Sequence, residues 1–187
     1  MRVSPILPLL LVTLCSAGCG EDELSTGFEG IYSIETWTEN DASCDSEGPS
    51  VLEQQSQTMF FVRIESFLFR SYVRAQLCSD LSSCRVRAAD PSLVISGGWS
   101  FPKGSDANGW TNSIFSSEAV DACTGTLDSY SLTSPSDGVL ELRRERRVGV
   151  EFAPGPAGCE PALAEAAAEG LPCQSLERIT ATLSGPL

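Results

Sequence analysis

Residues 125–152 read Gly-Thr-Leu-Asp-Ser-Tyr-Ser-Leu-Thr-Ser-Pro-Ser-Asp-Gly-Val-Leu-Glu-Leu-Arg-Arg-Glu-Arg-Arg-Val-Gly-Val-Glu-Phe, and they carry the clearest strand pattern in the chain. Its centre, residues 134–138 (Ser-Pro-Ser-Asp-Gly), holds the residue types that favour turns. The flanking runs, Gly125–Thr133 and Val139–Phe152, have the composition of strands. Two such runs joined by a short turn predict an antiparallel β-hairpin.

Other stretches of the chain share this strand-like character. Met59–Glu65 alternates, with Phe60, Val62 and Ile64 on one face. Many short strands in series predict an all-β domain, an antiparallel meander of about eight strands that forms a barrel or a sandwich. The remaining strand-like runs are Gly30–Thr38, Val73–Leu77, Leu93–Ser100, Trp110–Ser117 and Leu176–Leu183, with Arg85–Ala88 as a shorter candidate.

One helix is expected, in the alanine-rich run Glu160–Glu169. Pro161 suits the first helical position, and Gly170 stands where a chain commonly leaves a helix. The helix directly precedes the last predicted strand.

Gly30-Ile31-Tyr32, at the start of the first strand, resembles the Gly-x-Trp opening of the lipocalins, with Tyr32 in place of tryptophan. A helix ahead of the last strand is a second lipocalin-like feature. The resemblance covers these two short features only. It implies a calycin-like barrel in preference to a sandwich, with a hollow interior for a small amphiphile. We expect such a cavity to be lined by residues such as Tyr32, Ile34 and Phe61.

Residues 1–18 have the composition of a secretory signal peptide: one arginine, a short apolar run and small residues at the end. Ser16-Ala17-Gly18-Cys19 resembles the lipobox of bacterial lipoproteins of the myxobacterial type, which implies a lipid on Cys19. Glycine after that cysteine resembles the signal for sorting to the outer membrane. On this interpretation residues 19–28 form an acidic tether and residues 29–187 a single β domain. An ordinary signal peptide, cleaved near Ala17, is the alternative.

The cysteine count favours the lipidated alternative. Of eight cysteines, Cys15 lies inside the signal peptide and Cys19 would carry the lipid. The remaining six can pair fully in an oxidising compartment, whereas seven would leave an odd thiol. Proximity in sequence predicts the disulfides Cys159–Cys173 and Cys78–Cys84, which leaves Cys44–Cys123 by elimination.

Composition excludes several classes of function. The chain has 25 acidic and 12 basic residues, and a net charge of −13 disfavours binding to nucleic acid. It contains no histidine, so Ser-His-Asp and Cys-His catalysis and histidine-ligated metals are excluded. We expect no cofactor and no metal. A carboxylate-based hydrolase remains open, since it needs only two acids in one cleft.

The basic cluster Arg143–Arg147 supplies the sharpest site hypothesis. If Leu140 and Leu142 face inward, strict alternation also directs Arg144 and Arg146 inward, where they could bind a carboxylate or phosphate. The alternative, which we favour, pairs these arginines with acids on neighbouring strands, because an unpaired buried charge is costly.

The sequence therefore predicts an exported, lipid-anchored module of the cell envelope. The leading function is non-enzymatic binding of a small apolar or anionic ligand in the barrel. A protein-interaction module, binding another envelope protein through an exposed patch, is the first alternative. The hydrolase, which requires a carboxylate with a raised pKa, is the second.

Overall fold

The structure is a computed structural model, and the chain is described in four ranges. The signal peptide, Cys19 and most of the predicted tether lie outside them, as does the first part of the predicted strand Leu93–Ser100. The described residues are 26–67, 70–90, 98–118 and 123–187.

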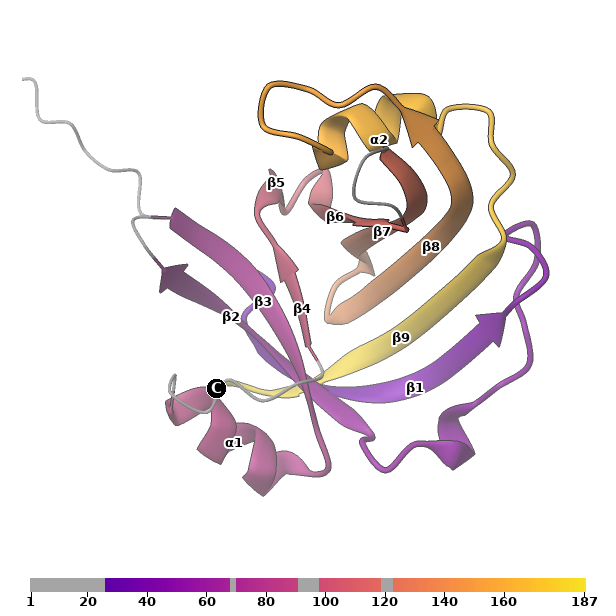
Figure 1. Ribbon diagram of the computed structural model, residues 1–187. Coiled ribbons are helices and arrows are strands. Elements are labelled where there is room, and N and C mark those ends of the chain that lie inside the picture. Colours follow the sequence, from indigo (N-terminus) through magenta and orange to yellow (C-terminus); the bar gives the residue numbers. More distant parts are fainter. Residues whose placement is uncertain (1–25, 68–69, 91–97, 119–122) are drawn as a thin grey trace, which may run out of the picture.

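Within these ranges, nine antiparallel strands form one sheet, in the order β4-β3-β2-β1-β9-β8-β7-β6-β5. Beyond its pairing with β3, β4 lies against β6 and β7, so the sheet nearly closes into a barrel (Figure 1). The predicted all-β barrel is confirmed. The strands are β1 (Gly30–Asn40), β2 (Met59–Phe67), β3 (Arg70–Cys78), β4 (Gly98–Phe101), β5 (Lys103–Ser105), β6 (Gly109–Ser117), β7 (Cys123–Ser136), β8 (Val139–Phe152) and β9 (Ser175–Gly185).

The barrel interior is packed with apolar side chains over most of its length. Strand register aligns one row across five strands, in which Trp110, Leu132, Leu142, Ile179 and Trp37 are successive partners from β6 to β1. All five are buried, Leu132, Leu142 and Ile179 completely. The middle of the barrel is therefore filled, which corrects the expectation of a hollow interior.

Glycine at position 149 changes the direction in which β8 presents its side chains. The register of β8 against β7 shifts by one residue here, and Gly149 has a φ of +73°, which favours glycine. Beyond this bulge, Val150 packs on the outer face with Leu127. Both lie beneath the helix α2 (Pro161–Ala167), which begins with proline as predicted.

A second helix, α1 (Leu81–Ala89), covers the outer face of β2 and β3 at the other side of the barrel. Asp80 caps it by accepting a hydrogen bond from the Ser83 amide, while the Ser83 hydroxyl accepts one from the Asp80 amide. The predicted short strand Arg85–Ala88 is therefore wrong. Phe61 was also wrongly expected inside the barrel, because it packs outward, in the cluster with Cys84 of this helix.

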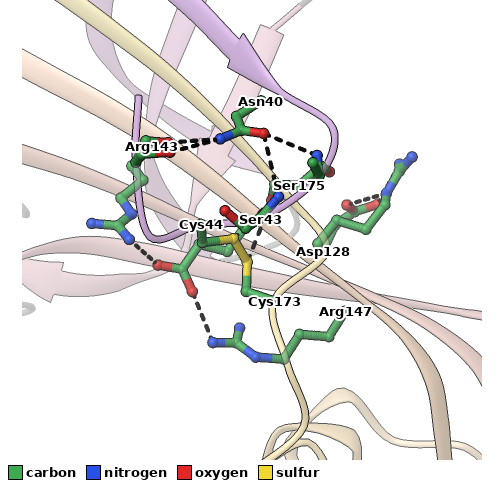
Figure 2. The surroundings of a disulfide bond; sticks show 12 residues. Asn40, Ser43, Cys44, Asp128, Arg143, Arg147, Cys173 and Ser175 are labelled. Atoms are coloured by element: carbon green, nitrogen blue, oxygen red, sulfur yellow. Dashed lines mark hydrogen bonds and ion pairs between the residues drawn. A yellow bond between two sulfur atoms is a disulfide. The ribbon is translucent and has the colours of Figure 1, made fainter. Parts of the chain in front are cut away.

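Three disulfides brace the domain: Cys44–Cys173, Cys78–Cys84 and Cys123–Cys159. The predicted Cys78–Cys84 pair is confirmed, but Cys159–Cys173 and Cys44–Cys123 are wrong. Helix α2 lies between Cys159 and Cys173. Cys159 pairs with Cys123 at the start of β7, and Cys173 pairs with Cys44 in the loop after β1. Figure 2 shows Cys44–Cys173 beside Arg143 and Arg147, both of which form ion pairs with Glu145.

The residues ahead of β1 form a strap across one end of the barrel. Asp106, in the turn between β5 and β6, accepts hydrogen bonds from the Thr26 hydroxyl, the Gly27 amide at 2.5 Å and Trp110 Nε1 at 2.8 Å. Burial alone would raise the pKa of Asp106, but these hydrogen bonds lower it below its ordinary value. Phe28 is buried by this arrangement and accepts a hydrogen bond from the Tyr32 hydroxyl through its carbonyl oxygen. We call residues 26–28 the strap.

Candidate functional site: the polar mouth of the barrel

The lining of the barrel changes from apolar to polar in a single two-residue step. Two positions along from the apolar row, the register aligns Asn112, Tyr130, Arg144, Glu177 and Glu39 on successive strands from β6 to β1. Alternation places both rows on the same face of the sheet. The far end of the barrel from the strap is therefore bordered by polar and charged groups.

A pocket of about 400 Å³ opens at this end, which we call the mouth pocket. This volume lies near the lower limit for small-molecule sites, which run from about 300 to 1,000 Å³. Apolar side chains come from β3, β4 and β6, and polar ones from β4, β6, β7, β8 and β9. The lining residues are Leu77, Gly98, Trp99, Ser100, Asn112, Ile114, Tyr130, Arg144 and Glu177.

Arg144 and Arg146 both contact Asp128 of β7. Arg146 binds it through two hydrogen bonds, from Nε at 2.9 Å and Nη2 at 3.1 Å, and Arg144 Nε donates to Oδ1 at 3.0 Å. Arg144 also lies beside Glu177 of β9, with 3.7 Å between Nη1 and Oε2. The prediction that these arginines pair with acids on neighbouring strands is confirmed.

The pKa values of Glu177 and Asp128, the two acids of this cluster, are shifted in opposite directions. Burial raises the pKa of Glu177, and the nearby charge of Glu39 adds to the effect, while Arg144 and the hydrogen bond from Trp37 Nε1 oppose it. Burial would also raise the pKa of Asp128, but the hydrogen bonds from Arg146 and Arg144 outweigh it and lower that pKa. Asp128 is thus the ionised counter-ion of the two arginines at neutral pH.

This arrangement fits binding better than hydrolysis. A hydrolase needs a second carboxylate free to act as base or nucleophile beside Glu177. Both oxygens of Asp128 already accept hydrogen bonds from arginine, and Glu39, the register partner of Glu177, is not part of the pocket lining. By contrast, the side-chain amide of Asn112 and the hydroxyl of Tyr130 form no hydrogen bond with any other residue that the structure describes.

The other residues predicted to bind a ligand lie elsewhere. Tyr32 is at the strap end, where it borders a hollow of about 620 Å³ together with Asp106 and Leu183. That hollow is larger than the mouth pocket, yet the hydroxyl of Tyr32 and both oxygens of Asp106 already have partners in the strap. We therefore place the candidate site at the mouth pocket. Ile34 belongs to the packed core.

Sequence reasoning missed the residues that complete the mouth pocket. Asp128, Tyr130 and Leu132 alternate along β7 and could have been recognised as one inward face. Nothing in the sequence distinguishes Glu177 among the 25 acidic residues, because its role depends on lying opposite Arg144.

The fold and site together define a nearly closed antiparallel barrel with a filled core and one polar, partly apolar pocket at its end. No family model, curated protein or solved structure matches the chain. Among the described residues, no cluster of acidic or cysteine side chains is arranged to hold a metal ion. In those same residues, we find no helix with the length and apolar character that a membrane crossing requires.

Proposed function

We propose that the protein is an exported lipoprotein whose barrel binds a small amphiphilic molecule in the mouth pocket. The observation that carries this proposal is the lining of that pocket. Apolar Leu77, Trp99 and Ile114 line the pocket together with polar residues. Among the described residues, the side-chain amide of Asn112 and the Tyr130 hydroxyl have no hydrogen-bond partner. Small-molecule sites are typically apolar hollows with a few convergent polar groups.

The disulfides support export. Three pairs, two of which join distant segments of the chain, fit an extracellular or periplasmic protein, where disulfides persist. Attachment through Cys19 rests on its resemblance to a lipobox and on the even number of remaining cysteines. A lipocalin-like role in carrying a ligand rests in turn on the fold and on Gly30-Ile31-Tyr32.

The packed core limits the size of the ligand. The buried row containing Leu132, Leu142 and Ile179 lies directly beneath the polar row, so a ligand can occupy the mouth but cannot extend along the barrel. A short apolar group lying against Trp99 and Ile114 fits this space. A long acyl chain does not fit, and its end would project out of the pocket into solvent.

An interface with another protein receives less support. Among the described residues, the most exposed large apolar side chains are distributed singly over separate elements. Val86 lies on α1, Ile114 on β6, Val148 on β8, Leu163 on α2, Leu183 on β9 and Leu187 just after β9. Protein-binding patches are contiguous, and scattered exposed residues need no such explanation.

Native mass spectrometry of the membrane-extracted protein tests the proposal. We expect a mature N-terminus at Cys19 with added acyl mass, together with a co-purified small molecule that denaturation removes. Ile114→Trp, which fills the mouth pocket, should abolish the ligand mass. Leu183→Trp is the matched control, because Leu183 is 50% exposed and Ile114 is 48% exposed, but Leu183 lies at the strap end. Equal ligand loss in both variants, or none in either, would refute the mouth pocket as the site.

A further inference from the structure

We propose that the head group bound in the mouth pocket is uncharged and hydroxylated, such as a glycosyl or polyol group, and is not a carboxylate or phosphate. This inference rests on the proposed function, since it names the chemistry of that same pocket. It sets aside the less favoured hypothesis from the sequence, that Arg144 and Arg146 bind an anion.

The positive charges around the pocket already have counter-ions within the protein. Arg144 and Arg146 supply two positive charges, and Asp128, Glu177 and Glu39 supply up to three negative ones. Both arginines direct Nε at Asp128 Oδ1, with Arg146 completing a two-bond contact. An incoming anion would have to displace Asp128 or lie against Glu177, and either arrangement leaves like charges close together in a partly desolvated site.

Hydrogen-bonding capacity at the mouth matches a hydroxyl group. The Asn112 amide and the Tyr130 hydroxyl each offer both a donor and an acceptor. Glu177 Oε2 lies 3.7 Å from Arg144, too far for a hydrogen bond, and can accept one from a ligand. A hydroxyl both donates and accepts, whereas a carboxylate only accepts and an ammonium only donates. An uncharged hydroxylated head group can therefore pair with all three groups. A carboxylate offers no donor to Glu177 Oε2, and an ammonium offers no acceptor to Asn112 and Tyr130.

The shape of the pocket agrees with a ring that has one apolar face. Trp99 of β4 is partly exposed at the mouth, while Trp37 and Trp110 are buried below it. The flat indole of Trp99 can lie against the C–H face of a sugar ring, whose hydroxyl rim then meets Asn112 and Tyr130. Leu77 and Ile114 complete the apolar side for a short alkyl chain.

Three probes that share a six-carbon chain test this assignment: hexyl β-glucoside, hexanoate and hexylamine. The exported protein is held in lipid nanodiscs without detergent, with empty nanodiscs as the blank. Affinity is measured at pH 7 by isothermal titration calorimetry, and by tryptophan fluorescence with Trp99→Phe as control. We expect the glucoside to bind at least tenfold more tightly than either charged probe, and its fluorescence change to disappear in Trp99→Phe.

The variant Asp128→Asn provides a second, independent test in the same binding assay. It releases Arg144 and Arg146 from their counter-ion, so hexanoate affinity should rise at least tenfold while the glucoside loses its advantage. Tighter binding of hexanoate than of the glucoside by the unaltered protein would overturn this inference and leave the proposed function standing. Binding of none of the three probes would overturn both.

Discussion

Replacing Asp128 with alanine removes the shared counter-ion of two arginines. Asp128 has a side chain only 11% exposed and accepts three hydrogen bonds from guanidinium groups. Breaking a fully buried ion pair costs about 3–5 kcal/mol. Here the arginines can regain water, since the side chains of Arg144 and Arg146 are 28% and 41% exposed. We therefore expect Asp128→Ala to lower the free energy of unfolding by about 2–3 kcal/mol, below the value for a fully buried pair.

The assay is urea denaturation at pH 7 with the disulfides intact, followed by far-ultraviolet circular dichroism. Glu47→Ala is the matched control, because Glu47 also binds an arginine, Arg178, but its side chain is 60% exposed. Removing such a surface pair should cost no more than about 0.5 kcal/mol. A double-mutant cycle of Asp128→Ala with Arg146→Ala should show a coupling free energy between the two residues, because they share two direct hydrogen bonds.

A cost below about 1 kcal/mol for Asp128→Ala, or one equal to that of Glu47→Ala, would refute this reasoning. It would mean that water already screens the cluster and that the polar row contributes nothing to the fold. The mouth pocket would then have no reason to reject anions, because Asp128 must hold both arginines for that rejection.

Three further predictions concern the core, the pH dependence and the long-range disulfide. Leu142→Ala truncates a completely buried side chain and should lower the free energy of unfolding by about 2–5 kcal/mol in the same denaturation assay. Because burial raises the pKa of Glu177 in the folded state, its ionisation costs stability as pH rises through that pKa. Glu177→Gln should therefore increase the melting temperature at pH 7, and this gain should disappear below about pH 4, where the glutamate is protonated in both states. Removing Cys44–Cys173 by the double alanine variant opens a loop of 129 residues and should cost up to about 5 kcal/mol by the chain-entropy relation. A variant as stable as the unaltered protein would contradict the prediction in each case.

Local patterns predicted the strands better than anything else. The bounds of β8 agree with the predicted Val139–Phe152, since a turn and a long strand-like run define it without help from the rest of the chain. Helix α1 was missed because its serines, arginines and single buried residue give a weak helical pattern. The Asp80–Ser83 capping pair was nonetheless visible in the sequence. β5 was not predicted, because its three residues around Gly104 are too few to show a periodicity.

For the candidate site, the sequence predicted only the features that depend on a single strand. Alternation along β8 correctly directed Arg144 and Arg146 inward. Their partners could not be predicted, because Asp128 and Glu177 lie on other strands and meet the arginines through strand register. The disulfides failed for the same reason: Cys44 and Cys173 are 129 residues apart in sequence, but their Cα atoms are 5.5 Å apart.

The strap has a consequence for how the protein would be oriented. Residues 26–28 are bound to Asp106 at one end of the barrel, and the mouth pocket lies at the opposite end of β1. With a lipid on Cys19, only six residues would separate the anchor from Thr26, a reach of about 20 Å. The strap end would then stand close to the bilayer and the mouth would open toward the aqueous side. A ligand would approach from solution and not by lateral passage out of the lipid.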